Sequence, residues 1–256
     1  MAKTILITGS TSGIGMGIAR CFAKEGYQII FNGLEPNGAE LAQQIADEFG
    51  IRHIFNPANM LDPDALKAMV AEAIQTFGNI DVLVNNAGIQ FVSPVEDFPE
   101  QKWNDIISIN LTAAFILTKA VWPSMKNQNR GRIINIASAH GLVASEFKSA
   151  YVAAKHGLVG FTKTIALEGA PFGITANAIC PGYVHTPIID KQIADQMKAH
   201  QMTADEVVQK VMLDKQAIKS FISIDTIAQS VLFLASETAN TITGIALPLD
   251  GGWTAQ

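Results

Sequence analysis

One helical stretch carries two side chains that could exchange a proton with a substrate. Residues 149–157 read SAYVAAKHG, which places Tyr151 four positions before Lys155, and such positions share one face of a helix. A free tyrosine has a pKa of about 10 and is a poor base unless a nearby ammonium favours the phenolate. The spacing predicts an acid–base pair in which Lys155 lowers the pKa of Tyr151. The alternative is an ordinary Tyr/Lys pair on a helix surface.

A glycine-rich loop near the amino terminus could hold a phosphate group. Residues 8–15 read TGSTSGIG, and they lie between an apolar run at 4–8 and a helical pattern. Glycine permits tight turns and a close approach of backbone to ligand, while a helix N-terminus attracts anions. The alternative is a plain turn between strand and helix, but the context favours a pyrophosphate site.

The elements that must position these residues alternate between short apolar runs and helical patterns. Continuous apolar runs are typical of parallel strands covered on both faces. The chain therefore predicts an α/β fold with a Rossmann-like, doubly wound, seven-stranded parallel sheet and helices on both faces. Such sheets bind ligands at the carboxyl ends of their strands. The predicted strands are residues 4–8, 28–32, 52–56, 80–85, 132–138, 175–180 and 244–249.

Length, composition and charge exclude several classes of protein. The 256 residues are 48% apolar, which suits one domain over residues 1–256. A net charge of −5 argues against a nucleic-acid partner. We see no signal peptide and no apolar run of membrane-spanning length, so we expect a cytoplasmic protein with no membrane partner. Cys21 and Cys180 form no C-x-x-C motif, and no His cluster suggests a metal.

Four motifs in order resemble those of the short-chain dehydrogenase/reductase family. They are TGSTSGIG at 8–15, NNAG at 85–88, Y-x-x-x-K at 151–155 and PG at 181–182, and DGGW at 250–253 resembles the C-terminal end of the family. The resemblance covers essentially the whole chain. Each motif is short, but their order makes the match specific.

The resemblance implies a catalytic tetrad around the Tyr/Lys pair. Tyr151 would exchange a proton with the substrate oxygen, and Ser138 would hold that oxygen by a hydrogen bond. Lys155 would also bind the nicotinamide ribose, and Asn110 would hold a water that links Lys155 to solvent.

The expected cofactor is NAD rather than NADP. An acidic residue after the second strand usually binds the ribose 2′-hydroxyl, but Gly33 stands there, and whether Glu35 replaces it stays open. No Lys or Arg between residues 25 and 51 would meet a 2′-phosphate, and Leu34 would crowd it. The expected cofactor-binding residues are Gly9, Thr11, Ser12, Gly13, Ile14, Gly15, Gly33, Leu34, Asn59, Met60, Asn86, Ala87, Gly88, Tyr151, Lys155, Pro181, Gly182, Val184 and Thr186.

Residues near the tetrad point to a short hydroxy acid as substrate. His140 and Lys148 bring a ring donor and a cation toward the reacting position, which suits a carboxylate, and Trp253 would form a wall for a methyl group. Residues 85–90, 133–145, 148–157, 175–187 and 250–255 are similar to the bacterial D-3-hydroxybutyrate dehydrogenase branch of the family. That branch interconverts D-3-hydroxybutyrate and acetoacetate with NAD. The expected substrate-binding residues are Gln90, His140, Lys148, Gln192 and Trp253.

Further expectations concern a lid, the assembly and rival functions. Residues 185–220 predict a helical substrate lid, although their methionines also suit ordinary packing. Helical patterns at 111–122 and 156–167 are apolar nearly all round, so part of each suggests a subunit interface, and the family implies a homotetramer. A 3-oxoacyl-thioester reductase is one alternative, which would need NADP and a basic residue near Ser12 or Leu34. A non-catalytic NAD-sensing protein is the other, which would usually lack a tetrad member.

Overall fold

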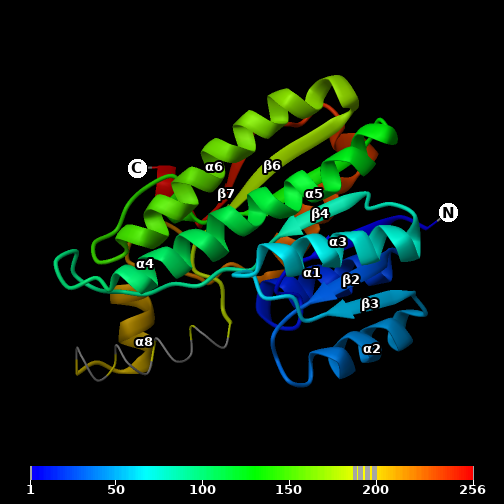
Figure 1. Ribbon diagram of the computed structural model, residues 1–256. Helices are drawn as coiled ribbons and strands as arrows, with labels where there is room; N and C mark the ends of the chain where they lie inside the picture. Colours follow the sequence, from blue (N-terminus) through cyan, green and yellow to red (C-terminus); the bar gives the residue numbers. More distant parts are fainter. Residues whose placement is uncertain (1, 187–188, 190–192, 194–196, 198–200, 256) are drawn as a thin grey trace.

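One parallel sheet forms the centre of the molecule (Figure 1). The computed structural model describes residues 2–186, 189, 193, 197 and 201–255. The strands in this part are β1 (Thr4–Ile7), β2 (Gln28–Asn32), β3 (His53–Asn56), β4 (Val82–Asn85), β5 (Gly131–Ile136), β6 (Ile174–Pro181) and β7 (Ala246–Leu249). Among the described residues they form one seven-stranded sheet in the order β3-β2-β1-β4-β5-β6-β7, and every neighbouring pair is parallel. The predicted doubly wound sheet is confirmed, with the reversal of strand order between β1 and β4.

Helices cover both faces of this sheet (Figure 1). The α-helices are α1 (Gly13–Lys24), α2 (Gly38–Phe49), α3 (Pro63–Phe77), α4 (Glu100–Ile107), α5 (Ala113–Asn127), α6 (Ser149–Gly169), α8 (Ala204–Val207) and α9 (Ile224–Ala235). The short π and 3₁₀ turns are Ser108–Thr112, Ala139–Gly141, Ala170–Phe172, Val208–Met212, Glu237–Ala239 and Trp253–Ala255. The core residues of α1, α2 and α9 pack on one face, and those of α3, α5 and α6 pack on the other.

Strand β1 shows why its sequence is continuously apolar. Ile5 and Ile7 belong to the core shared with α1 and α9, whereas Leu6 belongs to the core shared with α3 and α5. Since successive strand residues point to opposite faces, a sheet covered on both sides needs apolar residues at every position. Two packed layers therefore fix the strand ends, where the candidate site lies.

Some predicted strands end before the residues that carry chemistry. β1 ends at Ile7, and the hydroxyl of the next residue, Thr8, accepts hydrogen bonds from the backbone N–H groups of Asn86 and Ala87, both at 2.9 Å. β5 ends at Ile136 rather than at Ser138, which instead begins the turn Ala139–Gly141. The functional residues thus lie in the loops just past the strands.

The segment that includes α4 and α5 corrects one expectation. Its helix, Glu100–Asn127, is long and apolar enough to cross a membrane by length and composition, with a mean hydropathy of 1.4 in the best window. The expectation that no apolar run reaches that length is wrong. The physical reason is that α5 buries Leu117, Val121 and Met125 in the core, and core helices pass the same test.

The segment predicted as a lid is described in part. α8 begins at a capping box between Thr203 and Glu206, and it lies toward the end of the molecule where the strands terminate (Figure 1). Met212 is buried with Val207, and Met202 packs against them. The methionines therefore do pack together, whereas closure over a substrate stays a prediction.

Candidate active site

A cavity of about 720 Å³ lies at the carboxyl ends of the strands, beside the point where strand order reverses. Its walls come from the glycine loop, from the loops after β2 to β6 and from the start of α6. The predicted site residues that line it are Gly9, Ser12, Gly13, Ile14, Gly33, Leu34, Asn59, Met60, Asn86, Ala87, Gly88, Gln90, Ser138, His140, Lys148, Tyr151, Lys155, Pro181, Gly182, Val184, Thr186 and Trp253.

Among the described residues, three predicted ones do not line this cavity. Thr11 is buried within the glycine loop, and Asn110 is buried behind the loop after β4. Gly15 is also buried: a Cβ there would lie 2.1 Å from the carbonyl oxygen of Gly9, so its part is to let the loop close on the helix. Gln192 lies outside the described residues.

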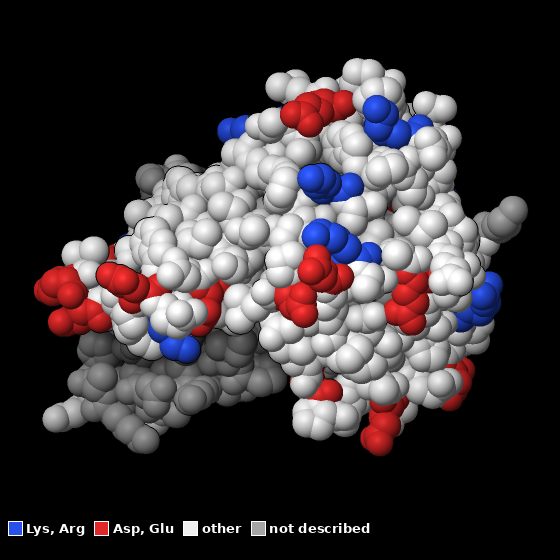
Figure 2. All heavy atoms as spheres, viewed as in Figure 1, with Lys and Arg blue, Asp and Glu red and all other residues white. Residues whose placement is uncertain are grey.

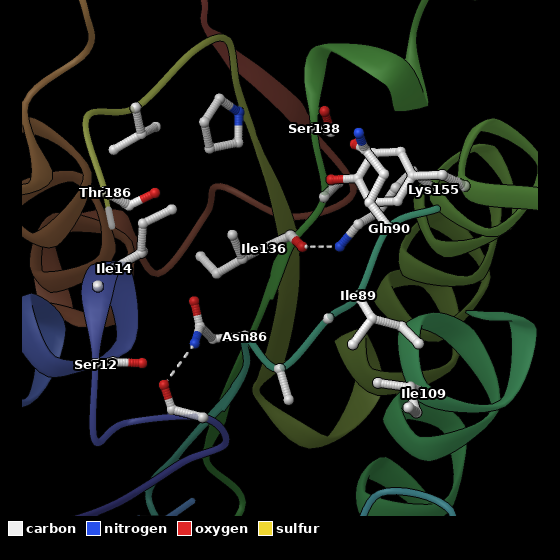
Figure 3. A pocket seen from close by; sticks show the side chains of 18 of the residues that line it. Ser12, Ile14, Asn86, Ile89, Gln90, Ile109, Ile136, Ser138, Lys155 and Thr186 are labelled. Carbon is white, nitrogen blue, oxygen red and sulfur yellow. Dashed lines mark hydrogen bonds between the residues drawn. The ribbon is translucent and has the colours of Figure 1, made fainter. Parts of the chain in front are cut away.

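The glycine loop has the conformation that its sequence predicts. Gly9 and Gly13 have φ angles of 60° and 50°, which L side chains adopt rarely. The amide of Asn86 donates to the carbonyls of Thr8 and Gly9 at 2.8 and 3.1 Å, and so fixes the loop to the end of β4 (Figure 3). The first turn of α1 holds no acidic residue. A bare backbone loop at a helix N-terminus fits a pyrophosphate group.

Glu35 points toward the glycine loop, whereas its contact with the cofactor ribose stays a prediction. Its carboxylate accepts hydrogen bonds from the hydroxyls of Thr11 and Ser12, the latter at 3.2 Å. Partial burial raises the pKa of Glu35, but these hydrogen bonds and those from the backbone outweigh burial and lower it. Gly33 leaves room for this arrangement, since a Cβ there would lie 2.6 Å from a Glu35 oxygen. An anionic carboxylate therefore stands in the wall of the cavity.

Tyr151 and Lys155 share one face of α6, as predicted. The Lys155 ammonium lies 5.6 Å from the centre of the Tyr151 ring and donates to the carbonyl of Ile136 at 2.8 Å (Figure 3). Burial lowers the pKa of Lys155 to about 8. Burial raises the pKa of Tyr151, although hydrogen bonding to Ser138 opposes that shift. The expectation of a lowered tyrosine pKa is wrong for the protein alone, because desolvation of the phenolate outweighs the favourable contacts.

Ser138 and His140 form a short network beside Tyr151. The Ser138 hydroxyl accepts from the backbone N–H of His140 at 3.1 Å, and the His140 ring lies 2.9 Å from the hydroxyl of Ser145. Burial is the main reason that the pKa of His140 falls to about 3, and the Lys148 charge adds to the shift. His140 is therefore neutral at physiological pH and serves as a hydrogen-bonding ring.

Asn110 fixes the loop that follows β4. Its side chain accepts from the backbone N–H of Ile89 at 2.8 Å and donates to the carbonyl of the same residue at 2.9 Å. It lies in the π turn Ser108–Thr112, a kind of helical irregularity that is frequent at functional sites. A Cβ on Gly88 would lie 3.2 Å from Asn110 Oδ1 and 3.6 Å from Lys155 Nζ, so the backbone of Gly88 runs close to both tetrad members.

Two residues that the sequence interpretation missed belong to one side of the cavity: Tyr183 lines it, and Lys215 lies beside Trp253 without lining it. The rings of Tyr183 and Trp253 stack at 5.8 Å, and Trp253 meets the edge of His140 at 5.0 Å. The ammonium of Lys215 lies 5.9 Å from the centre of the Trp253 ring. Tyr183 lies inside the PGYVHT stretch, and this position could have identified it as a residue of the cavity. No local sequence pattern connects Lys215 to this wall.

On the face in Figure 2, several acidic groups lie together at the left end, and acidic and basic groups are mixed over the rest. Within the described part of the chain, no group of three or more His, Cys, Asp or Glu residues could hold a metal ion.

The comparisons with known proteins agree with this geometry. The model of the short chain dehydrogenase family matches residues 3–197. A protein of Rhizobium meliloti named D-beta-hydroxybutyrate dehydrogenase is 50% identical over 260 residues, which cover 100% of both chains. A protein of Cupriavidus necator with the same name is 48% identical over 254 residues, which cover 99% of this chain and 98% of the relative.

A solved structure gives the same result for the fold. The crystal structure of actinorhodin polyketide ketoreductase with NADPH has a TM-score of 0.93 at 32% identity, and the match covers 100% of this chain and 98% of that one. Fold, cavity and relatives together make this protein an oxidoreductase with a nicotinamide cofactor. The chain belongs to the short-chain dehydrogenase family.

Proposed function

We propose that the protein catalyses the reversible, NAD-dependent oxidation of D-3-hydroxybutyrate to acetoacetate. The observation that carries the proposal is that Lys148 and His140 line the same cavity as Tyr151 and Ser138. A cation that suits a carboxylate thus accompanies a pair that exchanges protons with an alcohol. The names of the two bacterial relatives support the same substrate.

The residues of the chain would handle the proton and the orientation of the substrate. A nicotinamide cofactor, when bound, accepts a hydride from the carbinol carbon or returns it. Tyr151 takes the hydroxyl proton during oxidation and gives it back during reduction, while Ser138 donates a hydrogen bond to the same oxygen. Because burial raises the pKa of Tyr151, the positive charge of Lys155 is needed to favour the phenolate. Asn110 keeps the loop beside Lys155 in place.

The substrate carboxylate would be held by side chains other than those that hold its hydroxyl group. Lys148 supplies the charge, and Gln90 and neutral His140 supply hydrogen bonds. Trp253 forms an apolar wall for the methyl group. A role for Gln192 stays a prediction.

Glu35 supports NAD as the cofactor. Its carboxylate lies in the cavity wall beside the glycine loop, and the exposed Leu34 stands next to it. A 2′-phosphate would meet a negative charge there, and residues 25–51 contain no Lys or Arg to balance it. The ketoreductase structure holds NADPH at 32% identity, so a cofactor titration decides between the two.

We also propose that the protein is a cytoplasmic homotetramer. Phe115 of α5 is 47% exposed and Leu167 of α6 is 78% exposed, and large apolar side chains on helix surfaces suit a contact between subunits. Light scattering of the purified protein tests the number of subunits, and a monomer at micromolar concentration would contradict the assembly.

The test of the proposed reaction follows the absorbance of the reduced nicotinamide. D- and L-3-hydroxybutyrate are each supplied with NAD⁺ or NADP⁺, to the wild type and to Lys148→Ala. We expect turnover with the D acid and NAD⁺, and a large rise in KM for Lys148→Ala. Activity with a 3-oxoacyl thioester and NADPH, but with neither hydroxy acid, would contradict the proposal and favour a thioester reductase.

A further inference from the structure

We propose that Lys215 is a second cationic determinant for the carboxylate end of the substrate, which acts beside Lys148 and makes the enzyme select anionic substrates over uncharged ones. The inference rests on the proposed function, because it names a further group that recognises the carboxylate of the same hydroxy acid. Lys215 does not line the cavity itself, so it acts as a positioning and selectivity residue at the rim.

The first support is the aromatic wall that both lysines share. Tyr183 and Trp253 stack with an angle of 4° between their rings, and both line the cavity beside His140. The ammonium of Lys148 lies 6.0 Å from the centre of the Tyr183 ring, and that of Lys215 lies 5.9 Å from the centre of the Trp253 ring. Each ring of the stacked pair thus has a cation within the range of a cation–π contact.

The second support is that the backbone around Lys215 is fixed. Gln216 is only 1% exposed; it accepts from the backbone N–H of Tyr183 at 3.1 Å and donates to the carbonyl of Ser220 at 2.9 Å. Lys219 donates to the carbonyls of Leu213 and Asp214 at 3.0 and 2.6 Å. The turn that carries Lys215 is therefore connected directly to the aromatic wall.

The close packing around the Gln216 side chain also indicates that this turn is held in place. A Cβ on Gly182 would lie 2.8 Å from Gln216 Oε1, and a Cβ on Gly251 would lie 2.9 Å from Gln216 Nε2. The loops after β6 and β7 therefore close on this one side chain. The packing of Gln216 therefore places the backbone of the adjacent Lys215 beside the loops that carry Tyr183 and Trp253.

The third support is electrostatic. Burial is the main cause that lowers the pKa of Lys148, and the positive charge of Lys215 lowers it further. The two ammonium groups are therefore close enough to repel one another. The nearby carboxylate of Asp250 accepts from the backbone N–H groups of Gly252 and Thr254 and from the Thr254 hydroxyl. A substrate carboxylate bound at this wall would be attracted by both ammonium groups, whereas an uncharged ester would not.

The experiment removes the charge of Lys215 and compares a charged with an uncharged substrate. Lys215→Gln and Lys215→Met remove the charge and keep much of the stem, whereas Lys215→Arg keeps the charge. Lys210→Gln is the matched control, because Lys210 lies on the same segment, is exposed and pairs with Glu206 at 3.0 Å. Each variant is assayed with D-3-hydroxybutyrate and with its methyl ester, used as substrate or as competitive inhibitor.

We expect both neutral variants to raise KM for the acid roughly tenfold at low salt, with kcat nearly unchanged and the affinity for the ester unaltered. Added salt should raise KM for the acid in the wild type and less so in Lys215→Gln. Lys215→Arg and Lys210→Gln should behave like the wild type.

Two results would overturn the inference while the proposed function stands. One is an unchanged KM for the acid in both neutral variants, and the other is an equal loss of affinity for acid and ester, which would mark a purely structural role. A wild type that turns over neither enantiomer of the acid would instead overturn the proposed function, and this inference with it.

Discussion

The ammonium of Lys155 lies one helical turn beyond Tyr151, 5.6 Å from the centre of its ring, and holds the carbonyl of Ile136 at the end of β5. Burial reverses the usual order of their proton affinities, since it lowers the pKa of Lys155 to about 8 and raises the pKa of Tyr151. At neutral pH the pair is an ammonium beside a phenol. In the protein alone, Tyr151 is therefore set to donate a proton.

Tyr151→Phe should abolish turnover while the fold and cofactor affinity persist. The substitution removes the only proton-exchanging atom of this side chain but keeps its ring, and general acid–base groups contribute roughly 10²–10⁴-fold to rates. The measurement is kcat with the preferred hydroxy acid, together with a fluorescence titration of the reduced cofactor. A variant that kept more than about a tenth of wild-type kcat would contradict the role of Tyr151 as acid and base.

Glu35→Gln should weaken the discrimination against NADP⁺. The substitution removes a carboxylate that accepts hydrogen bonds from Thr11 and Ser12 in the wall beside the glycine loop. We expect kcat/KM with NADP⁺, relative to that with NAD⁺, to rise by about fivefold, since a repelling charge of this kind is worth about 1 kcal/mol.

Glu40→Gln is the matched control for this change. Glu40 is an exposed residue in the first turn of α2 and does not line the cavity. An equal change of cofactor preference in both variants would show that net charge alone, rather than the position of Glu35, sets the preference.

Local patterns predicted the sheet and most of the cavity. Continuous apolar runs marked every strand, because both faces of the sheet are covered, and the glycine and Tyr/Lys spacings marked the loops that meet at its edge. The strand ends were predicted less well. Thr8 and Ser138 were predicted inside strands, but β1 and β5 end before them, and their hydroxyls accept hydrogen bonds from the backbone N–H groups of Asn86 and His140.

Features that depend on distant contacts could not be predicted from local patterns. Lys215 meets Trp253 only because Gln216 connects two loops from different parts of the chain. The aim of Glu35 depends on Thr11, a residue from the preceding loop. The direction of the Tyr151 pKa shift depends on burial, which is a property of the folded cavity rather than of the i, i+4 spacing.

His140 should make the protein less stable as the pH falls. Its pKa is about 3 in the folded protein against an ordinary 6.5, so the unfolded chain binds more protons between those two values. The contribution of the neutral ring is complete above pH 6.5 and is lost as the pH falls toward 3. The loss is roughly 1 kcal/mol per pH unit within that window.

His140→Gln tests this prediction by chemical denaturation at pH 7, 6 and 5. The difference in unfolding free energy between the wild type and His140→Gln should change in favour of the variant as the pH falls. The control is His185→Gln, which removes an exposed imidazole and shows how far the loss of any one histidine changes the slope. Parallel curves for the wild type and His140→Gln would contradict the buried neutral ring.

Gly15→Ala should damage both the fold and the cofactor site, whereas Gly160→Ala should be harmless. A Cβ at Gly15 would lie 2.1 Å from the carbonyl oxygen of Gly9 and 2.6 Å from the amide nitrogen of Asn86, so the glycine loop must move. A Cβ at Gly160, on α6, meets nothing within 4 Å. We expect a loss of about 2–3 kcal/mol for Gly15→Ala and a gain of about 0.5–1 kcal/mol for Gly160→Ala, because alanine favours a helix. Thermal unfolding and titration with NADH measure both effects, and wild-type stability with wild-type affinity in Gly15→Ala would refute the close packing of loop and helix.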